Sequence, residues 1–205
     1  MKGRIILLLL LIGSLQINAQ EGHKLNTGID MSYGPHYFGS DRHNPLSGGF
    51  SIGYEYDFVF FFGVEAGFRI GGYNQSVRYG EKAEIKDTYQ GTYWAPYIAP
   101  KLYLPIGYDE KKDRPRFVYI ENRFSYGRMN IDLDKINNME GSAHKYQFQY
   151  EFRAGYQFPI SQRWAMNCWL GYNTFDFSKI NKEVIKFKNT TPIQIGIGFN
   201  YIIKQ

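Results

Sequence analysis

Apolar and polar residues alternate strictly along several stretches of the chain, and the segment "YQFQYEFRAGYQF" at residues 146–158 shows this pattern most clearly. Its apolar or aromatic residues occupy every second position, separated by Gln, Glu, Arg and Gly. Successive side chains of an extended strand point to opposite faces, so a period of two predicts a β-strand with two different faces. The functional question is what the aromatic face of this strand contacts.

The same alternation recurs along the chain and predicts an all-β fold of eight strands without a helix. We expect strands at residues 25–34, 48–56, 60–71, 92–104, 117–127, 146–158, 164–174 and 190–203. Alternate connections are long and polar, near residues 35–47, 72–91, 128–145 and 175–189. The others are brief turns near 57–59 and 159–163 and an intermediate link near 105–116. This contrast is typical of a closed, antiparallel, up-and-down transmembrane β-barrel.

The first residues show the pattern of a secretory signal peptide. Lys2 and Arg4 precede an apolar run at residues 5–12, and a polar stretch that ends in Ala19 follows. The apolar run is too short to span a membrane as a helix, which needs about 20 such residues. We therefore expect Sec-type export and cleavage near Ala19, with residues 1–19 as the signal peptide and 20–205 as one barrel domain.

The face opposite the aromatic rings distinguishes a membrane barrel from a soluble one. A secreted, lipocalin-like barrel would pack the rings in its core and expose the other face to water. That other face is rich in glycine, and each glycine in a strand costs about 0.5–1 kcal/mol relative to alanine. A narrow eight-stranded lumen needs such small residues, because its interior holds only closely fitted side chains. We therefore favour rings that face lipid and glycines that face the lumen.

Charged residues share the glycine-rich face, and we expect them to form a structural network inside the lumen. They are Asp30, Glu55, Glu65, Arg69, Lys101, Glu121, Arg123, Glu151 and Arg153. Charges removed from water must be paired and hydrogen-bonded, so this nearly balanced set fits a salt-bridged plug. A proton or ion path along the same groups is the alternative. On the opposite face we expect lipid contact by Phe50, Phe62, Phe68, Tyr146, Phe148, Tyr150, Phe152, Tyr156, Phe199 and Tyr201.

Composition narrows the classes of function further. Aromatic residues make up 18% of the chain, although its mean hydropathy is only −0.42. The formal net charge of +5 includes the two basic residues of the signal, and no Lys/Arg stripe suggests nucleic-acid binding. The single cysteine, Cys168, excludes an internal disulfide and a cysteine-based metal site.

Together with the signal peptide and the eight alternating strands, the C-terminal segment "QIGIGFNYIIKQ" resembles the small outer-membrane β-barrel domain family of OmpX/PorT type. The assembly signal of that family is similar to polar-x-Gly-x-x-aromatic-x-aromatic, and Gln194, Gly196, Phe199 and Tyr201 match it in order and spacing. The chain departs from the family in its tail, "IIKQ", because many such chains end on an aromatic residue. The resemblance implies location in the outer membrane of a Gram-negative bacterium and insertion by the barrel-assembly machinery.

Candidate chemistry outside the lumen is sparse, and we predict no catalytic, cofactor-binding or metal site. His36, Asp41 and His43 follow no known metal-ligand spacing. Acyl hydrolysis would need a serine, a histidine and a carboxylate in contact. The sequence-local candidates are Ser40 near His43, and Ser142 near His144 with Glu140. All of them fall in predicted loops.

These observations favour a structural or surface-interaction role in the outer membrane without catalysis. The alternatives are a narrow pore or secretion-accessory barrel, and a lipid-modifying enzyme. The last long connection carries Lys179, Lys182, Lys186 and Lys188 against Asp176 and Glu183, and it could rest on lipopolysaccharide phosphates. A solvated loop is the simpler interpretation. The sequence does not identify a surface protein partner.

Overall fold

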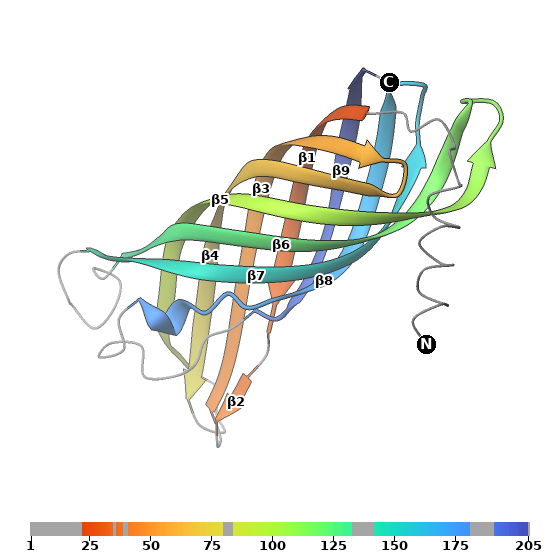
Figure 1. Ribbon diagram of the computed structural model, residues 1–205. Helices are drawn as coiled ribbons and strands as arrows, with labels where there is room; N and C mark the ends of the chain where they lie inside the picture. Colours follow the sequence, from red (N-terminus) through yellow and green to blue (C-terminus); the bar gives the residue numbers. More distant parts are fainter. Residues whose placement is uncertain are drawn as a thin grey trace, which may run out of the picture.

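The computed structural model describes residues 22–34, 36–38, 41–79, 84–132, 142–180 and 191–204. Within them the chain forms β1 (Gly22–Tyr33), β2 (His36–Phe38), β3 (Asp41–Val59), β4 (Phe62–Tyr79), β5 (Glu84–Asp109), β6 (Arg114–Asp132), β7 (Ser142–Pro159), β8 (Trp164–Asn173), the 3-10 turn η1 (Phe177–Lys179) and β9 (Ile193–Lys204). Apart from the short β2, each strand pairs antiparallel with both neighbours, and β1 pairs with both β3 and β9 (Figure 1). The predicted closed barrel of eight antiparallel strands is confirmed.

The alternation in the sequence follows directly from this closure. Every second residue of β6 is buried from Phe117 to Ile131, and the residues between them are exposed or half-buried. Each strand has one face toward the lumen and one away from it, because a closed barrel has only these two surfaces.

Several strands extend further than the hydrophobic pattern predicted, which corrects the expected loop boundaries. β4 continues to Tyr79 and β5 begins at Glu84, so most of the segment 72–91 is strand and not loop. β3 likewise extends into the segment 35–47, β6 into 105–116 and 128–145, and β7 into 128–145. Neighbouring strands are held together by backbone hydrogen bonds, so strand pairing continues where neither face is apolar. The first turn is also displaced, since it lies at residues 60–61 and not at 57–59.

Both ends of the described chain lie at the same end of the barrel. His23 of β1 is the register partner of Lys204 of β9. The short turns at residues 60–61, 110–113 and 160–163 lie at this end, which we call the turn end. The longer connections leave from the opposite end, the loop end, where β2 and η1 are also found (Figure 1).

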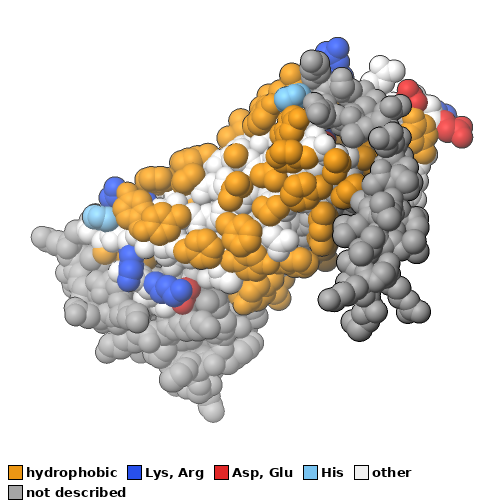
Figure 2. All heavy atoms as spheres, in the orientation of Figure 1, with side chains coloured by type: hydrophobic (Ala, Val, Ile, Leu, Met, Phe, Trp, Pro, Cys, Tyr) orange, Lys and Arg blue, Asp and Glu red, His pale blue; other side chains and the backbone are white. Residues whose placement is uncertain are grey.

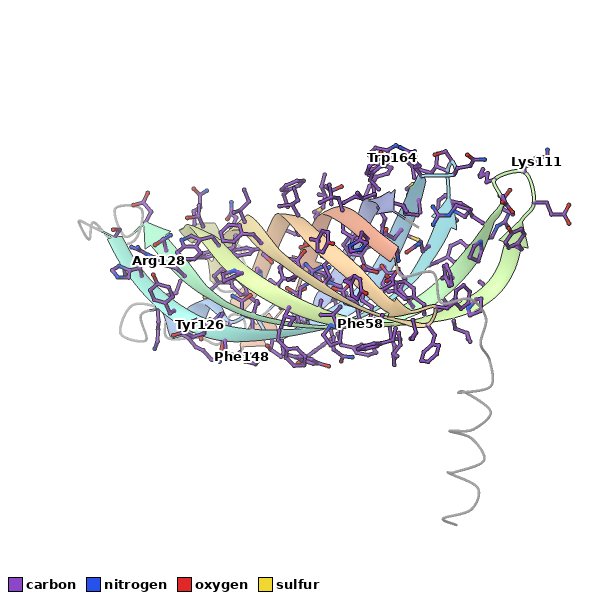
Figure 3. The ribbon with its side chains drawn as sticks, turned by 45° about the horizontal axis from the view of Figure 1, so that its top comes forward. Phe58, Lys111, Tyr126, Arg128, Phe148 and Trp164 are labelled. Atoms are coloured by element: carbon purple, nitrogen blue, oxygen red, sulfur yellow. The ribbon has the colours of Figure 1, made fainter. Side chains whose placement is uncertain are left out.

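The outer surface is a broad apolar belt. Leu170, Ile193 and Ile29 are exposed to 63%, 61% and 60%, values that are unusual for large aliphatic side chains. Figure 2 shows apolar side chains across the middle of the visible face, with Lys and Arg gathered toward its two ends. In Figure 3, Lys111 and Trp164 lie toward the turn end and Arg128 toward the loop end. No helix in the described residues is long and apolar enough to cross a membrane.

Glycines of the inner face make room for large rings that point into the lumen. Gly67 is the register partner of Tyr97, and Gly196 is the partner of Trp169. A Cβ atom at either glycine would collide with the ring opposite and with a backbone carbonyl. The same pairing of glycine with ring recurs at Gly71–Tyr93, Gly91–Tyr73 and Gly155–Tyr119. The ring therefore occupies the space that a side chain at the glycine position would otherwise fill.

Candidate functional site

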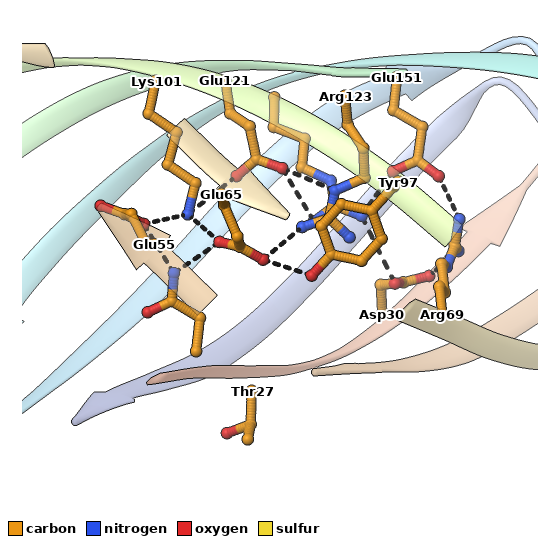
Figure 4. Close-up of polar contacts among 12 residues, drawn as sticks. Thr27, Asp30, Glu55, Glu65, Arg69, Tyr97, Lys101, Glu121, Arg123 and Glu151 are labelled. Atoms are coloured by element: carbon orange, nitrogen blue, oxygen red, sulfur yellow. Dashed lines mark hydrogen bonds and ion pairs between the residues drawn. The ribbon is translucent and has the colours of Figure 1, made fainter. Parts of the chain in front are cut away.

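The structure places all nine predicted lumen charges inside the barrel, where each is at most 4% exposed. They come from β1, β3, β4, β5, β6 and β7 and converge on one connected network, of which Figure 4 shows a close-up. The strand register brings them together, because inward positions of neighbouring strands lie level with one another. Glu121 faces Lys101 on one side and Arg153 on the other, and Arg123 faces Glu151.

The part of the network nearer the turn end is centred on Lys101. Its ammonium group contacts Glu55 at 2.8 Å, Glu121 at 3.5 Å, and also Glu65. The side-chain amide of Asn26 donates to Glu55 at 2.6 Å and to Glu65 at 2.5 Å. Two buried carboxylates at directly paired positions are therefore held by one cation and one amide.

The middle of the network consists of alternating guanidinium and carboxylate groups. Arg123 Nε donates to Glu121 at 2.9 Å, and its guanidinium also lies 3.6 Å from Glu65. Arg153 contacts Glu151 at 2.5 Å and Glu121 at 3.5 Å. Each buried charge has at least one opposite partner at short range, which offsets its removal from water.

Arg69 completes the network toward the loop end. Its guanidinium donates to both Asp30 and Glu151, so it joins carboxylates from β1 and β7 across the lumen. Arg153 also lies 3.7 Å from Asp30. Because the network crosses the barrel and links opposite strands, it fills the lumen at this level as well as stabilising individual charges.

Sequence reasoning assigned the aromatic residues to lipid and missed the rings that line the lumen. Tyr97 donates to Glu65, and Tyr103 donates to Glu55 at 2.5 Å. The Arg123 guanidinium lies 3.8 Å from the Tyr97 ring centroid, and that of Arg153 lies 5.0 Å from the Trp169 centroid. The sequence of β5 does indicate that these tyrosines point inward, because they alternate with the outward residues. The alternation of apolar and polar residues in β5 is, however, less regular than in β7.

Lys24 is a further member of the network that sequence reasoning missed. It is 7% exposed and contacts Asp57 at 2.6 Å and Glu55 at 3.1 Å. We counted the first strand from Leu25, although β1 begins at Gly22. Extending the alternation backward by two residues from the inward position of Asn26 would have found it.

At the loop end a segment after β8 folds into the barrel and closes it with apolar side chains. Phe175, Phe177 and Ile180, which we call the loop plug, are at most 9% exposed. They pack against four inward residues of the wall, Tyr73, Tyr93, Met129 and Ile131. The ring centroids of Phe177 and Tyr73 are 3.4 Å apart, and those of Phe175 and Tyr93 are 4.8 Å apart.

The loop plug corrects the interpretation of residues 175–180 as the start of a solvated loop. Asp176 is 6% exposed and caps η1, since its carboxylate accepts hydrogen bonds from Ser178 N at 3.1 Å and Ser178 Oγ at 2.6 Å. The alternating aromatics of this segment were assigned to a polar connection because it carries so many polar neighbours. Lys179 is exposed, and Lys182, Glu183, Lys186 and Lys188 lie outside the described residues.

The ten residues expected to contact lipid all lie on the outer face, in alternation with buried inward neighbours. Phe50, Phe68, Tyr146, Phe148, Phe152 and Phe199 are exposed, and Phe62, Tyr150, Tyr156 and Tyr201 are half-buried among their neighbours. Figure 3 shows Phe148 and Tyr126 directed away from the barrel. Cys168 is exposed on the same face of β8.

The residues that match the assembly pattern lie on β9. Gly196 is buried and turned inward, and Phe199 is turned outward. Gln194 is also buried, and it accepts a hydrogen bond from Arg153 Nε at 3.2 Å. In the folded barrel the polar position of the pattern therefore also belongs to the lumen network.

Of the residues considered for metal binding or hydrolysis, the structure describes the side chains of Ser142 and His144. The side chains of His36, Ser40, Asp41 and His43, and residue Glu140, lie outside the described part of the chain. Ser142 and His144 are exposed on β7, where their register partners are Asp132 and Asn130. In the ranges that the structure describes, no group of three His, Cys, Asp or Glu could hold a metal ion.

Comparison with known proteins identifies the family. The sequence matches the Outer membrane protein beta-barrel domain family over residues 5–202. The chain belongs to this family. Members of the Outer membrane protein beta-barrel domain family are located in the bacterial outer membrane, which is therefore the location that membership implies. No curated protein matches the sequence.

The solved structure of an outer-membrane barrel shows the same fold, and two others cover most of the chain with lower scores. The outer membrane protein OprG from Pseudomonas aeruginosa superimposes with a TM-score of 0.59 at 13% identity, covering 91% of this chain and 98% of that one. Neisserial surface protein A gives a TM-score of 0.49 at 11% identity, and the match covers 88% of this chain and 96% of that one. Ail, the attachment invasion locus protein of Yersinia pestis, gives 0.47 at 14%, covering 90% and 99%. At these identities the likeness to OprG concerns the fold alone.

Proposed function

We propose that the protein is a closed, non-conducting and non-catalytic barrel with a structural or surface-interaction role in the outer membrane. The observation that carries this proposal is the sorting of side chains between the two surfaces. Large apolar residues such as Leu170 and Ile193 are exposed outward, whereas the charges are buried inward. Exposing the first set to water would destabilise the barrel. Exposing it to lipid acyl chains is favourable.

Two independent layers support closure of the lumen. The charge network crosses the barrel in its middle, and the loop plug fills it toward the loop end. An ion would have to displace both the paired charges and the packed rings. The lumen of an eight-stranded barrel is too narrow to hold the displaced side chains. In planar bilayers we expect no stepwise conductance from the wild-type protein. Steady unitary currents would instead support the pore alternative.

The two ends of the barrel fit different sides of the membrane. We propose that the turn end, with both chain ends, faces the periplasm and that the loop end faces outward. The rings of Trp164 and Tyr201 pack in a tilted arrangement at the turn end, with centroids 4.9 Å apart, and would lie at headgroup level. Residues 1–19 would direct export and be cleaved near Ala19, and the β9 pattern from Gln194 to Tyr201 would be read by the barrel-assembly machinery.

A contact between the last connection and lipopolysaccharide is part of the same proposal. The exposed Lys179 emerges next to the loop plug, which holds the start of this connection at the loop end. A lysine fixed near the outer leaflet is placed to meet lipid phosphates.

Gel mobility together with detergent partitioning of the membrane fraction tests the proposed location and closure. A closed membrane barrel runs at a different apparent mass before and after boiling, and it partitions with detergent. We expect both behaviours. A protein that stays in the periplasmic or secreted fraction would contradict the membrane barrel and favour a soluble one. An altered lipid A profile in a deletion strain would contradict the absence of catalysis.

A further inference from the structure

A cavity of about 650 Å³ opens at the turn end of the barrel, where the β5–β6 hairpin extends past the mouth of the lumen. Its volume lies within the range of pockets that bind small organic molecules, about 300–1,000 Å³. Its walls are largely apolar and include Phe60, Tyr103, Pro105, Phe117 and Ile202. Tyr103 and Phe117 pack edge to face with centroids 5.5 Å apart, so this wall is built from fixed rings.

One cation in this apolar cavity has no carboxylate partner. Arg114 is 8% exposed, and its Nη1 donates to the carbonyl oxygen of Gln162 at 3.1 Å. No carboxylate in the described ranges lies within ion-pair distance of its guanidinium. A guanidinium carries five N–H donors in a rigid fork, so most of its capacity is unused. All five bases of the lumen network, by contrast, have carboxylate partners.

The other charged groups at the cavity already have polar partners at contact distance. Lys24 and Asp57 pair at 2.6 Å, and Lys24 also contacts Glu55. The Asp113 carboxylate accepts a hydrogen bond from Tyr108 on the facing strand of the hairpin. Arg114, which begins β6 beside Pro115, is therefore the cation at the cavity without a carboxylate at ion-pair distance, and the Asp57 carboxylate acts on it only at longer range.

We propose that this cavity binds a small organic carboxylate that has an apolar body. The carboxylate would take the free side of the Arg114 fork, and the body would lie against Phe60, Tyr103 and Phe117. A nearly buried guanidinium without a carboxylate in contact is costly, and a carboxylate matches its geometry with two parallel hydrogen bonds. The apolar walls favour an organic acid over an inorganic anion, because burying apolar surface contributes binding free energy only when the ligand has an apolar body.

Fluorine NMR of the full mature barrel in lipid nanodiscs tests this site with a defined probe, 4-(trifluoromethyl)phenylacetate. Its neutral counterpart, 4-(trifluoromethyl)phenylacetamide, has the same body without the charge. We expect saturable binding of the acid, at least tenfold weaker binding of the amide, and no displacement of the acid by equimolar inorganic phosphate. Equal binding of acid and amide, displacement by phosphate, or a signal that does not saturate would overturn the proposal.

Two arginines on the same strand give a matched pair of variants. Arg114→Gln removes the unmatched cation, whereas Arg116→Gln removes one whose side chain is 46% exposed and pairs with Asp109 at 3.3 Å. We expect at least tenfold weaker binding of the acid by R114Q and unchanged binding by R116Q. Equal affinities in the two variants would contradict the site. If R114Q does not fold, Arg114→Lys, which keeps the charge but loses the fork, should still weaken binding severalfold, and undiminished affinity in R114K would overturn the proposed geometry.

Discussion

Glu55 and Glu65 lie directly opposite each other on β3 and β4, and both carboxylates are buried inside the barrel. Like charges at paired positions of an antiparallel ladder destabilise it. This pair is tolerated because Lys101 contacts both carboxylates and Asn26 donates to both. Lys101 is therefore the cation that the two carboxylates share, and Lys24 and Arg123 each contact one of them.

Replacing the ammonium group of Lys101 should destabilise the barrel strongly. Lys101→Met leaves two facing carboxylates without their shared cation, and breaking a buried pair in this way costs about 3–5 kcal/mol. Urea titration of the refolded protein in lipid, followed by tryptophan fluorescence, measures the change. Lys111→Met is the control, because this lysine lies exposed in the β5–β6 turn and its loss should change stability by less than about 0.5 kcal/mol. Equal effects of the two variants would show that Lys101 is not needed to hold the carboxylates.

Glycines opposite inward rings should tolerate no side chain. A Cβ on Gly67 would collide with the Tyr97 ring and with the backbone carbonyl of Ile52, which cannot move independently of the ladder. We expect Gly67→Ala to lower the free energy of unfolding by about 1–3 kcal/mol. A Cβ on Gly107 would meet no atom within 4 Å, so Gly107→Ala should be neutral within about 0.5 kcal/mol. The prediction fails if both variants unfold at the wild-type urea concentration.

The loop plug should open locally without unfolding of the barrel. Phe177→Ala removes the ring stacked on Tyr73, so residues 175–180 lose their main apolar contact while the charge network stays intact. We expect faster hydrogen exchange in the peptide that covers this segment and little change in the strands. Lys179→Ala, an exposed position in the same segment, is the control and should exchange as the wild type does. Unchanged exchange after Phe177→Ala would mean that other contacts hold the segment.

An arginine on the outer belt should be costly although the site is fully open. Leu170 is 63% exposed, so in water Leu170→Arg would be nearly neutral. In lipid it should cost about 2–4 kcal/mol near the bilayer middle. Ile106→Arg on the β5–β6 hairpin is the control, since Ile106 is similarly exposed but lies toward the turn end, where the cost falls to about 0–1 kcal/mol. Urea titrations of the two variants refolded in the same lipid compare their free energies of unfolding.

The sequence was sufficient to predict the barrel and the charged lumen, because lipid and lumen impose opposite requirements on alternate residues. It was insufficient for features that depend on how strands are paired. The alternation in β5 already places Tyr97 on the inward side, but the register that sets it opposite Gly67 cannot be read from one strand alone. The end of β4 and the start of β5 were missed because backbone hydrogen bonds continue beyond the residues in which apolar and polar side chains alternate.

The loop plug and Arg114 were missed for a different reason. Phe175 and Phe177 are buried against residues of β4, β5 and β6, and local patterning does not indicate which distant residues such a segment contacts. Arg114 lies in a polar link whose sequence indicates only a turn, and its unmatched charge becomes apparent only when the cavity around it is seen. In both cases the decisive neighbours are distant in the chain.

The native cysteine offers the most direct measurement of which medium surrounds the belt. Cys168 lies exposed on the outer face of β8, between the register partners Tyr156 and Ile197, and the chain has no other cysteine. A nitroxide attached there, in protein reconstituted into lipid vesicles, can be probed by power saturation with oxygen and with a water-soluble nickel chelate. Contact predominantly with oxygen is the result expected if lipid covers this face. Contact predominantly with the nickel chelate would mean that water covers it, and the assignment of the two barrel surfaces would be wrong.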